Sequence, residues 1–400
     1  MRQQDAPAVT TRWTDPFLDT LRGQGDPEAD EALLMMLGDN EALGLNALFA
    51  HMDVNDEVPP STHFPILSEF FKATERLPAD VDVRRITRGE KVFEDHAFSG
   101  ALVLLTKSLP EGYQAPNLAI VLNVSGDLRT RTYRRLLGTL QAVVNVSTCH
   151  GFQHGGRAVI TAQKLRLLHA GVRHLTRKYR PDYAGTYGVP VNLEDMLGTV
   201  LGFSLLVIQG WRTLGAGLTR AQEEDFLYLW MVFARLAGIH PPGQPESGEY
   251  VPDNVADAAA LYERYKQRHY VDGSRNPDGL ALAEANLRML TSLIPWPLRL
   301  MGFGSLPALC MHHLMGDEPC LRLRVPFTRG TPQIVRMLLF VHRLLTVFGP
   351  VHLPDHEHLG MILFQKLITR SYGGRITYSV PTNAADLRAM VEKKVPHPHP

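Results

Sequence analysis

The sequence predicts an all-α protein, and three observations support this. Apolar residues recur at helical spacing through most of the 400 residues, signals for strands are sparse, and 44% of the residues are hydrophobic, which is enough for a large buried core. The best candidate for a strand is residues 375–380. The length suits one large domain or two small ones. We take a single domain over 1–400 with its core at about 98–240, and expect a disordered tail at 390–400.

The expected helices follow one another along the whole chain. Residues 28–50 carry leucines among acidic residues and indicate one or two short helices. Further helices are expected at 66–76, 98–109, 127–147, 157–179, 193–203, 220–237, 253–269, 278–292, 304–315, 331–348 and 356–371.

Several helix ends have residues that favour a start or a stop. The helix at 98–109 should end at Pro110, and Asp127 should cap the start of the helix that follows the next loop. Thr219 with Gln222 three residues later forms a capping box for the helix at 220–237.

Charge gives little support for a nucleic-acid partner. The 41 basic residues balance the 41 acidic ones, and a nucleic-acid binder usually carries a basic stripe. Basic residues gather only at 131–135 and 173–180, inside helical patterns, where a solvated helix face is the simpler interpretation.

Cysteine use and hydropathy favour a cytoplasmic protein without a membrane span. Cys149, Cys310 and Cys320 are too few and too scattered for a disulfide framework, so we expect a reducing compartment. The first residues lack the apolar core of a secretory signal. The longest apolar stretch, 196–208, is too short to cross a bilayer and is expected to be a buried helix.

The helix predicted at 157–179 carries the most informative residues. His169 shares one face with Arg166 and Arg173, because residues three and four apart are neighbours on a helix. The three fall within roughly 60° of arc, and leucines occupy the adjoining arc. An anionic, mostly apolar cofactor would fit this arrangement, with the imidazole on a metal and the guanidinium groups on carboxylates. A hydrogen-bonded structural histidine has the same spacing.

His174 lies well round the helix from His169, so the two histidines are not expected to share one metal site.

The preceding helix adds Arg135 and Thr139, four residues apart. They either direct a guanidinium and a hydroxyl into the same space, or form an ordinary salt bridge and a threonine bonded back to its own helix.

Together these residues resemble a known signature. Arg135 and Thr139, followed after a glycine-containing loop by Arg166, His169, Arg173 and His174, are similar to the motif of the family that contains latex clearing protein and the fungal mycophenolic acid biosynthesis oxygenase. The segments at 101–113 and 188–203, the second with a capped helix start at Asn192, agree with the same family. The resemblance covers residues 98–203.

The resemblance implies a globin-like helical core that holds haem b. His169 would be the axial ligand of the iron, and Arg166 and Arg173 would flank it and stabilise the haem environment or its propionates. Arg135 and Thr139 would hold the pocket together and are the catalytic candidates. In the family, dioxygen is used to cleave a carbon–carbon double bond of an isoprenoid chain, so the implied partners are dioxygen and an apolar small molecule.

Two positions depart from the rubber-cleaving branch of that family. The residue before the motif threonine is a lysine in that branch and is Gly138 here. A gap-free comparison puts Ala119 at the position of a distal glutamate, and the nearest acidic residue upstream is Glu111. The resemblance therefore does not extend to these two acid–base groups of the rubber-cleaving branch.

Two further motifs have metal-like composition. The Asp-His-Glu-His run at 355–358 lies near an expected helix start, where polar residues are common. Cys149, His150 and His154 share a loop without a second ligand pair.

Three functional hypotheses follow. The first is a haem b-dependent oxygenase. The second is a haem protein that binds or senses a gas, or stores haem, without oxygenating a substrate; Gly138 and Ala119 favour it modestly. The third is a helical interaction protein without haem.

Overall fold

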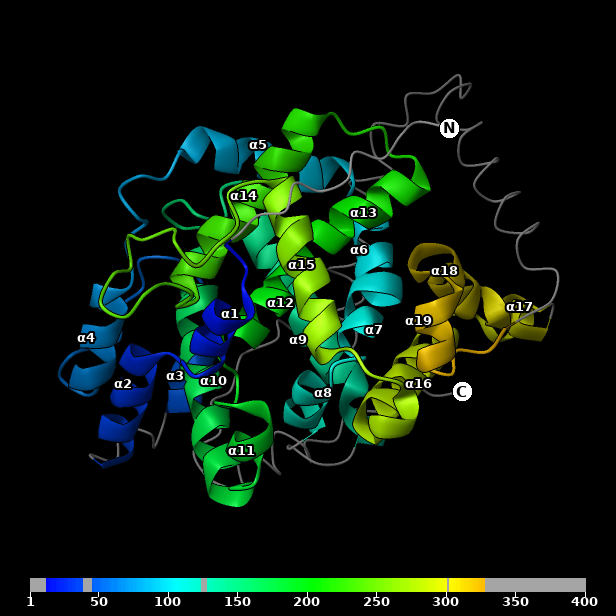
Figure 1. Cartoon of the computed structure of the whole chain (residues 1–400). Helices are drawn as coiled ribbons and strands as arrows, with labels where there is room; N and C mark the ends of the chain where they lie inside the picture. Colours follow the sequence, from blue (N-terminus) through cyan, green and yellow to red (C-terminus); the bar gives the residue numbers. More distant parts are fainter. Residues whose placement is uncertain (1–11, 39–44, 124–127, 301, 328–400) are drawn as a thin grey trace.

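The computed structural model describes residues 12–38, 45–123, 128–300 and 302–327, and within these ranges it contains helices and no strand (Figure 1). The all-α prediction is confirmed. The first helices are α1 (Asp15–Arg22), α2 (Pro27–Gly38), α3 (Leu45–His51), α4 (Pro65–Ala73), α5 (Val83–Asp95), α6 (Ala97–Val103), a π-helical turn η1 (Leu104–Ser108), α7 (Leu109–Gly112) and α8 (Pro116–Asn123).

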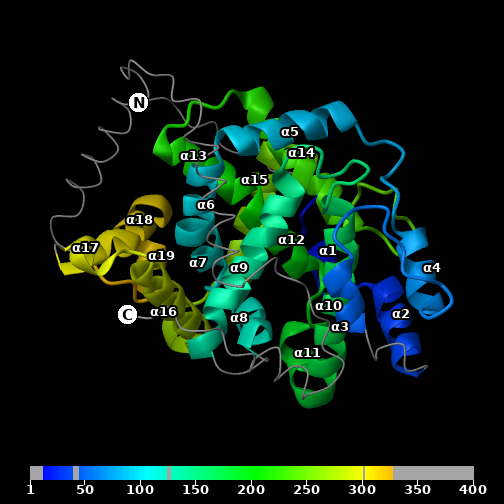
Figure 2. The ribbon, with the colours of Figure 1, turned by 180° about the vertical axis from the view of Figure 1, so that it is seen from behind.

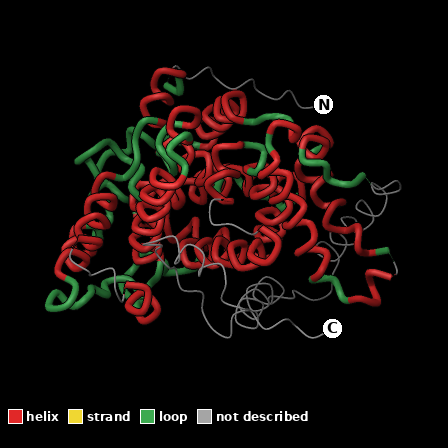
Figure 3. The backbone as a smooth tube through the Cα atoms, turned by 90° about the horizontal axis from the view of Figure 1, so that it is seen from below, coloured by secondary structure: helices red, strands yellow, loops and turns green. Residues whose placement is uncertain are grey.

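The central helices are α9 (Leu128–Ser147), α10 (Ala158–Tyr179), α11 (Tyr183–Tyr187), α12 (Leu193–Phe203), α13 (Leu205–Leu214), α14 (Arg220–Leu236) and α15 (Val255–His269). The last described elements are η2 (Gly273–Arg275), α16 (Pro277–Ser292), α17 (Trp296–Leu300), η3 (Phe303–Ser305), α18 (Leu306–Met315) and α19 (Asp317–Arg322). Seen from below, most of the described chain is helical, and loops of different lengths connect the helices (Figure 3).

Buried hydrophobic side chains of the described residues form three clusters, and α10 belongs to two of them. The largest joins α1, α5, α6, α9, α12, α13, α14 and α15, the second joins α2, α3 and α4, and the third joins α8 to α16, α18 and α19. Val159 and Ala162 of α10 contribute to the largest cluster, whereas Ile160 and Leu167 contribute to the second. The helix that carries His169 therefore lies between two parts of the core, and Figures 1 and 2 show it between α2 and α9.

A glycine lets α5 and α14 approach closely. A Cβ at Gly89 would lie 2.5 Å from the carbonyl oxygen of Asp225, so only glycine fits there. The carboxylate of Asp225 accepts from Arg85 at 3.0 Å and pairs with Arg88. Backbone contact and ion pairs thus fix α5 against α14.

Several sequence predictions are confirmed. The region 28–50 forms two short helices, α2 and α3. Thr219 and Gln222 form the capping box of α14, and Asn192 caps α12 by accepting from the amide of Asp195 at 2.8 Å. Gly238 follows α14 with a φ of 90°, a conformation that favours glycine.

The prediction that Pro110 ends a helix is wrong. The chain continues helically through η1 into α7, because Pro110 occupies one of the first two positions of α7, where its missing N–H is not needed. The helices α1, α5, α8, α11, α13, α17 and α19 were not predicted. The cap at Asp127, the helices at 331–348 and 356–371, the strand at 375–380 and the tail lie outside the described residues.

The apolar stretch near residue 200 forms two helices rather than one. α12 and α13 meet at Ser204, whose side chain donates to the carbonyl oxygen of Val200 at 2.9 Å. Among the described residues, Leu193–Leu214 alone has the length and composition of a membrane span, and 78% of its apolar window is buried inside the fold. This burial is typical of core helices in a folded domain.

Candidate functional site

The apolar arc of α10 that adjoins the two motif arginines, with His169 at its edge, is less covered than the rest of the helix. Leu165, Leu168, His169 and Val172 are only partly buried, although most other residues of α10 are buried. Their spacing of three and four residues places them on one side of the helix. The leucine-lined face predicted from the sequence is therefore the face with room beside it.

The imidazole of His169 has an unusual environment. Its Nδ1 atom is buried and has no hydrogen-bond partner in the described part of the chain. Burial lowers the pKa of His169 to about 4, and the charge of Arg173 acts in the same direction, while Asp26 opposes them. The ring is neutral at neutral pH, so it keeps the nitrogen lone pair that a metal ion requires.

Arg166, one turn before His169, is held by carboxylates of the protein itself. Its Nε donates to Asp26 Oδ2 at 2.6 Å and its Nη2 to Asp26 Oδ1 at 2.8 Å, and Nη2 also donates to Glu28 at 2.6 Å. The guanidinium carbon lies 5.3 Å from the centre of the Phe70 ring. Although burial opposes it, the charge of Arg166 holds the pKa of Asp26 below its usual value.

Arg173, one turn after His169, is fully buried. Its Nε donates to Asp30 at 2.7 Å and its Nη1 to the carbonyl oxygen of Val191 at 3.2 Å, whereas Nη2 has no partner among the described residues. Burial raises the pKa of Asp30, and Arg173 opposes that rise. The structure thus brings the two motif arginines and His169 together on one helix, with carboxylates from the start of α2 on the arginines.

The α9 residues of the motif are described in part. The backbone of Arg135 lies in α9, but its side chain is outside the described part. Thr139 and Gly138 are partly buried, and α9 packs against α10. Ala119 is fully buried in α8.

Glu111 is buried and already paired. Tyr262 of α15 donates to it at 2.6 Å, and Lys107, in the π-helical turn, forms an ion pair with it. Tyr262 and Tyr270 share a hydrogen bond of 2.8 Å. The nearest upstream acid therefore belongs to a polar cluster that binds α7 to α15.

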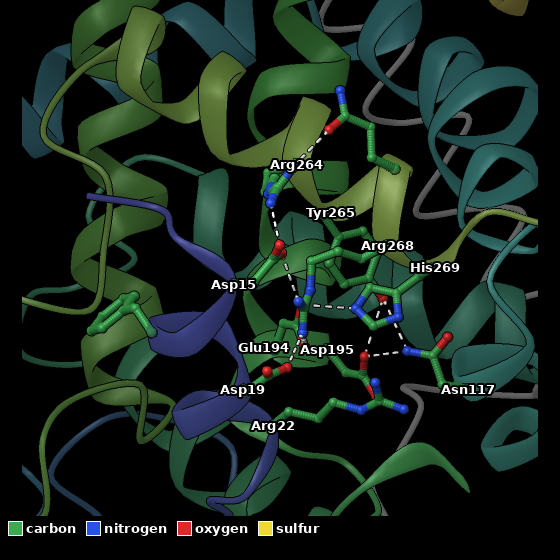
Figure 4. A network of polar contacts seen from close by, with 12 residues as sticks. Asp15, Asp19, Arg22, Asn117, Glu194, Asp195, Arg264, Tyr265, Arg268 and His269 are labelled. Atoms are coloured by element: carbon green, nitrogen blue, oxygen red, sulfur yellow. Dashed lines mark hydrogen bonds and ion pairs between the residues drawn. The ribbon is translucent and has the colours of Figure 1, made fainter. Parts of the chain in front are cut away.

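A second polar network fixes the start of α12 (Figure 4). Asp195 accepts from Tyr265 at 3.2 Å and from Asn192 at 3.0 Å, and Asn117 of α8 also donates to it. Burial raises the pKa of Asp195 to about 6 in spite of these donors and of His269 nearby.

The neighbouring Glu194 extends this network to α1. Arg268 donates to it at 2.7 Å and His269 Nε2 lies 2.8 Å from it, while Arg268 also reaches Asp15 at 2.8 Å. The network thus connects α1, α8, α12 and α15.

Two glycines of α12 differ in how crowded they are. Gly202 is buried, yet no described residue would lie within 4 Å of a Cβ placed on it. Gly198, four residues earlier, is crowded, since its Cβ would lie 2.7 Å from Tyr265. Thr199 is exposed and Phe203 is partly buried on the same helix.

The other metal-like residues do not gather into a site. Cys149 donates through its amide and its thiol to Glu94, both at 3.0 Å, and His154 lies 2.7 Å from Asp56. Over the ranges that the structure describes, no group of three or more histidine, cysteine and acidic residues is placed to hold a metal ion. The run at 355–358 lies outside those ranges.

Sequence reasoning missed the acidic partners of the two motif arginines. Asp26, Glu28 and Asp30 alternate along the chain at the start of α2, and this spacing was the available signal. Acidic residues are also favoured in the first turn of any helix, so the spacing alone did not point to α10.

The arrangement of the helices is that of a known structure. The chain matches "Structure of Latex Clearing Protein LCP in the closed state" with a TM-score of 0.74 and 20% sequence identity, covering 90% of this chain and 95% of that chain. This likeness shows the fold. The fold and the site define an all-α domain that carries His169 on one of its central helices.

The family follows from the sequence match. The model of the family described as "ER-bound oxygenase mpaB/B'/Rubber oxygenase, catalytic domain" matches residues 97–348, and the chain belongs to this family. The rubber oxygenase of Streptomyces sp. (strain K30) is 25% identical over 280 residues, which are 67% of this chain and 64% of that protein. The match therefore spans less than two thirds of that relative.

Proposed function

We propose that this protein is a haem b-dependent oxygenase in which His169 is the axial ligand of the iron. The observation that carries the proposal is the buried Nδ1 of His169, which has no hydrogen-bond partner among the described residues. An unpaired buried polar atom is costly, so proteins rarely keep one without a reason. A neutral imidazole between two motif arginines is a suitable ligand for haem iron.

The surroundings fit a flat, mostly apolar group. Leu165, Leu168 and Val172 lie on the same face of α10 as His169 and are incompletely covered. When bound, haem b would supply the iron chemistry that uses dioxygen to oxidise or cleave a carbon–carbon double bond.

The protein's own residues would bind and orient. His169 would fix the group to α10, and Thr139 would present a hydroxyl from α9, the neighbouring helix. Arg135, on the same helix as Thr139, is proposed to act with it in the pocket. The substrate class we propose is an apolar, isoprenoid-like small molecule with a double bond, since apolar side chains recognise it by surface contact alone.

Pigment tests the haem hypothesis directly. The protein, expressed with haem precursors, should be red with a Soret band that His169→Ala weakens sharply. His174→Ala is the matched control on the same helix and should keep the band. A folded, colourless wild-type protein would refute the proposal.

A second function is favoured by a specific observation. The rubber-cleaving branch has a lysine where this chain has Gly138 and, in a gap-free comparison, a glutamate where it has the buried Ala119. Neither residue of this chain carries an acid–base group. A haem protein that binds or senses a gas, or stores haem, needs neither group. Oxygen consumption and carbonyl formation with terpenoid alkenes separate the two functions, because turnover no faster than that of free haemin would favour binding alone.

A further inference from the structure

The two arginines that flank His169 are held from outside the matched catalytic domain. Asp26, Glu28 and Asp30 lie at the start of α2, whereas the family model begins at residue 97. Arg166 and Arg173 lie one helical turn on either side of His169. The carboxylates of α2 therefore hold α10 at two points that bracket the histidine.

The first of these pairs is buried on both sides. Asp26 is 2% exposed and Arg166 is 3% exposed, and they share two hydrogen bonds. Removing two charges from water is costly, so a buried pair adds little to stability compared with apolar residues of similar volume. Such a pair instead fixes one geometry, because two parallel hydrogen bonds between a guanidinium and a carboxylate set the orientation of both side chains.

The surrounding backbone leaves room for both pairs. Gly238 has a φ of 90°, and a Cβ there would lie 2.7 Å from Asp26 Oδ2 and 3.2 Å from Arg166 Nε. A Cβ on Gly25 would lie 3.0 Å from Cδ of Arg173. Asp26 also caps α2 by accepting from the amide of Ala29 at 3.1 Å. The end of α14 and the start of α2 thus both meet α10 at these pairs.

We propose that Asp26 and Asp30 are positioning residues for His169. Through Arg166 and Arg173 they fix the rotation of α10 about its axis and its position along that axis. This inference rests on the proposed function, since His169 is there the ligand of haem. It assigns to a segment outside the family's catalytic region a part in building the site.

The chain offers a matched control pair. Arg212 donates to Glu223 through two bonds of 2.6 and 2.5 Å, and Glu223 is buried. This pair joins α13 to α14 and does not involve α10. Loss of either carboxylate breaks a two-bond pair, but only the loss of Asp26 should affect His169.

The experiment compares haem affinity and the iron spectrum in D26N, D26E, D30N and E223Q. D26N should bind haem about 10–100-fold more weakly and alter the ligand-field bands, as is typical when residues that orient a metal-binding histidine are lost. D30N is the milder variant, because Asp30 is partly exposed, and D26E should recover much of the affinity by restoring the charge. E223Q should leave both readouts unchanged. Wild-type affinity and spectrum in D26N and D30N, or an equal loss in E223Q, would overturn the proposal.

A second readout needs no haem. Amide hydrogen exchange of residues 166–173 in the haem-free protein reports local opening of α10. It should be faster in D26N than in E223Q, and equal rates would overturn the positioning role. A colourless wild type with this difference would refute the haem function and leave the positioning of α10 intact.

Discussion

The phenol of Tyr265 donates to the carboxylate of Asp195 at 3.2 Å, and this bond joins α15 to the first turn of α12. Asn117 and Asn192 donate to the same carboxylate. Three donors do not offset its burial, so the carboxyl group holds its proton to higher pH than it would in water.

Asp195 should make stability depend on pH. Its pKa is raised from 3.8 to about 6, so the folded protein keeps a proton that the unfolded chain has already released. The free energy of unfolding should therefore fall as the pH rises through this range, by up to roughly 3 kcal/mol, and level off above it. Urea denaturation of wild type and Asp195→Asn at pH 4.5 and pH 7 tests this. Asparagine cannot ionise, so the wild type should lose stability relative to the variant at pH 7. Parallel profiles would contradict the assignment.

Tyr262→Phe should destabilise the protein more than Tyr250→Phe. The hydroxyl of Tyr262 donates to the buried carboxylate of Glu111 at 2.6 Å, whereas that of Tyr250 contacts the neutral Gln24 at 3.5 Å. Loss of a bond to a buried charged group costs about 1–3 kcal/mol. Chemical denaturation of both variants provides the measurement, and equal losses would show that Glu111 does not depend on Tyr262.

Gly238→Ala should cost more than Gly243→Ala. Both glycines have positive φ, at 90° and 69°, so alanine is strained at each, by about 1–3 kcal/mol. The methyl added at Gly238 meets the ion pair of Asp26, at 2.7 Å, whereas no described residue lies within 4 Å of a Cβ on Gly243. Melting temperatures of the two variants isolate the cost of the collision. A smaller loss at Gly238 would mean that the pair moves aside freely.

Gly202→Ala and Gly198→Ala should have opposite effects on the haem-free protein. No described residue lies within 4 Å of a Cβ on Gly202, so alanine should add its helix preference of about 0.5–1 kcal/mol without a clash. Alanine at Gly198 would push against the ring of Tyr265, and overpacking of this kind costs about 1–3 kcal/mol. Thermal unfolding without haem is the measurement. Destabilisation by Gly202→Ala would show that the space is smaller than the structure indicates.

Local chemistry made much of the fold predictable. The capping box at Thr219 and the cap at Asn192 satisfy helix-end amides with neighbouring side chains, so short-range sequence patterns are sufficient to find them. The same holds for the face of α10 around His169, which follows from helical spacing.

Contacts between distant segments were not predictable in this way. Arg166 and Asp26 are 140 residues apart in the chain, and nothing near either residue identifies its partner. The short helix α1 packs on α12, and the bond from Arg268 to Asp15 joins it to α15. Where tertiary contacts decide a structure, local propensity is a weak guide.

The π-helical turn at Leu104–Ser108 adds one residue to a helix, and the amide of Leu109 reaches back to the carbonyl oxygen of Leu104. Each extra residue rotates all that follows by about 100°. Glu111 follows this turn, so its direction toward Tyr262 includes that rotation about the helix axis. A homologue with an ordinary α-turn here would be one residue shorter, and its alignment with this chain would need a gap inside 104–108. An insertion of this kind changes which of the following side chains face the interior, although none of those residues has been substituted.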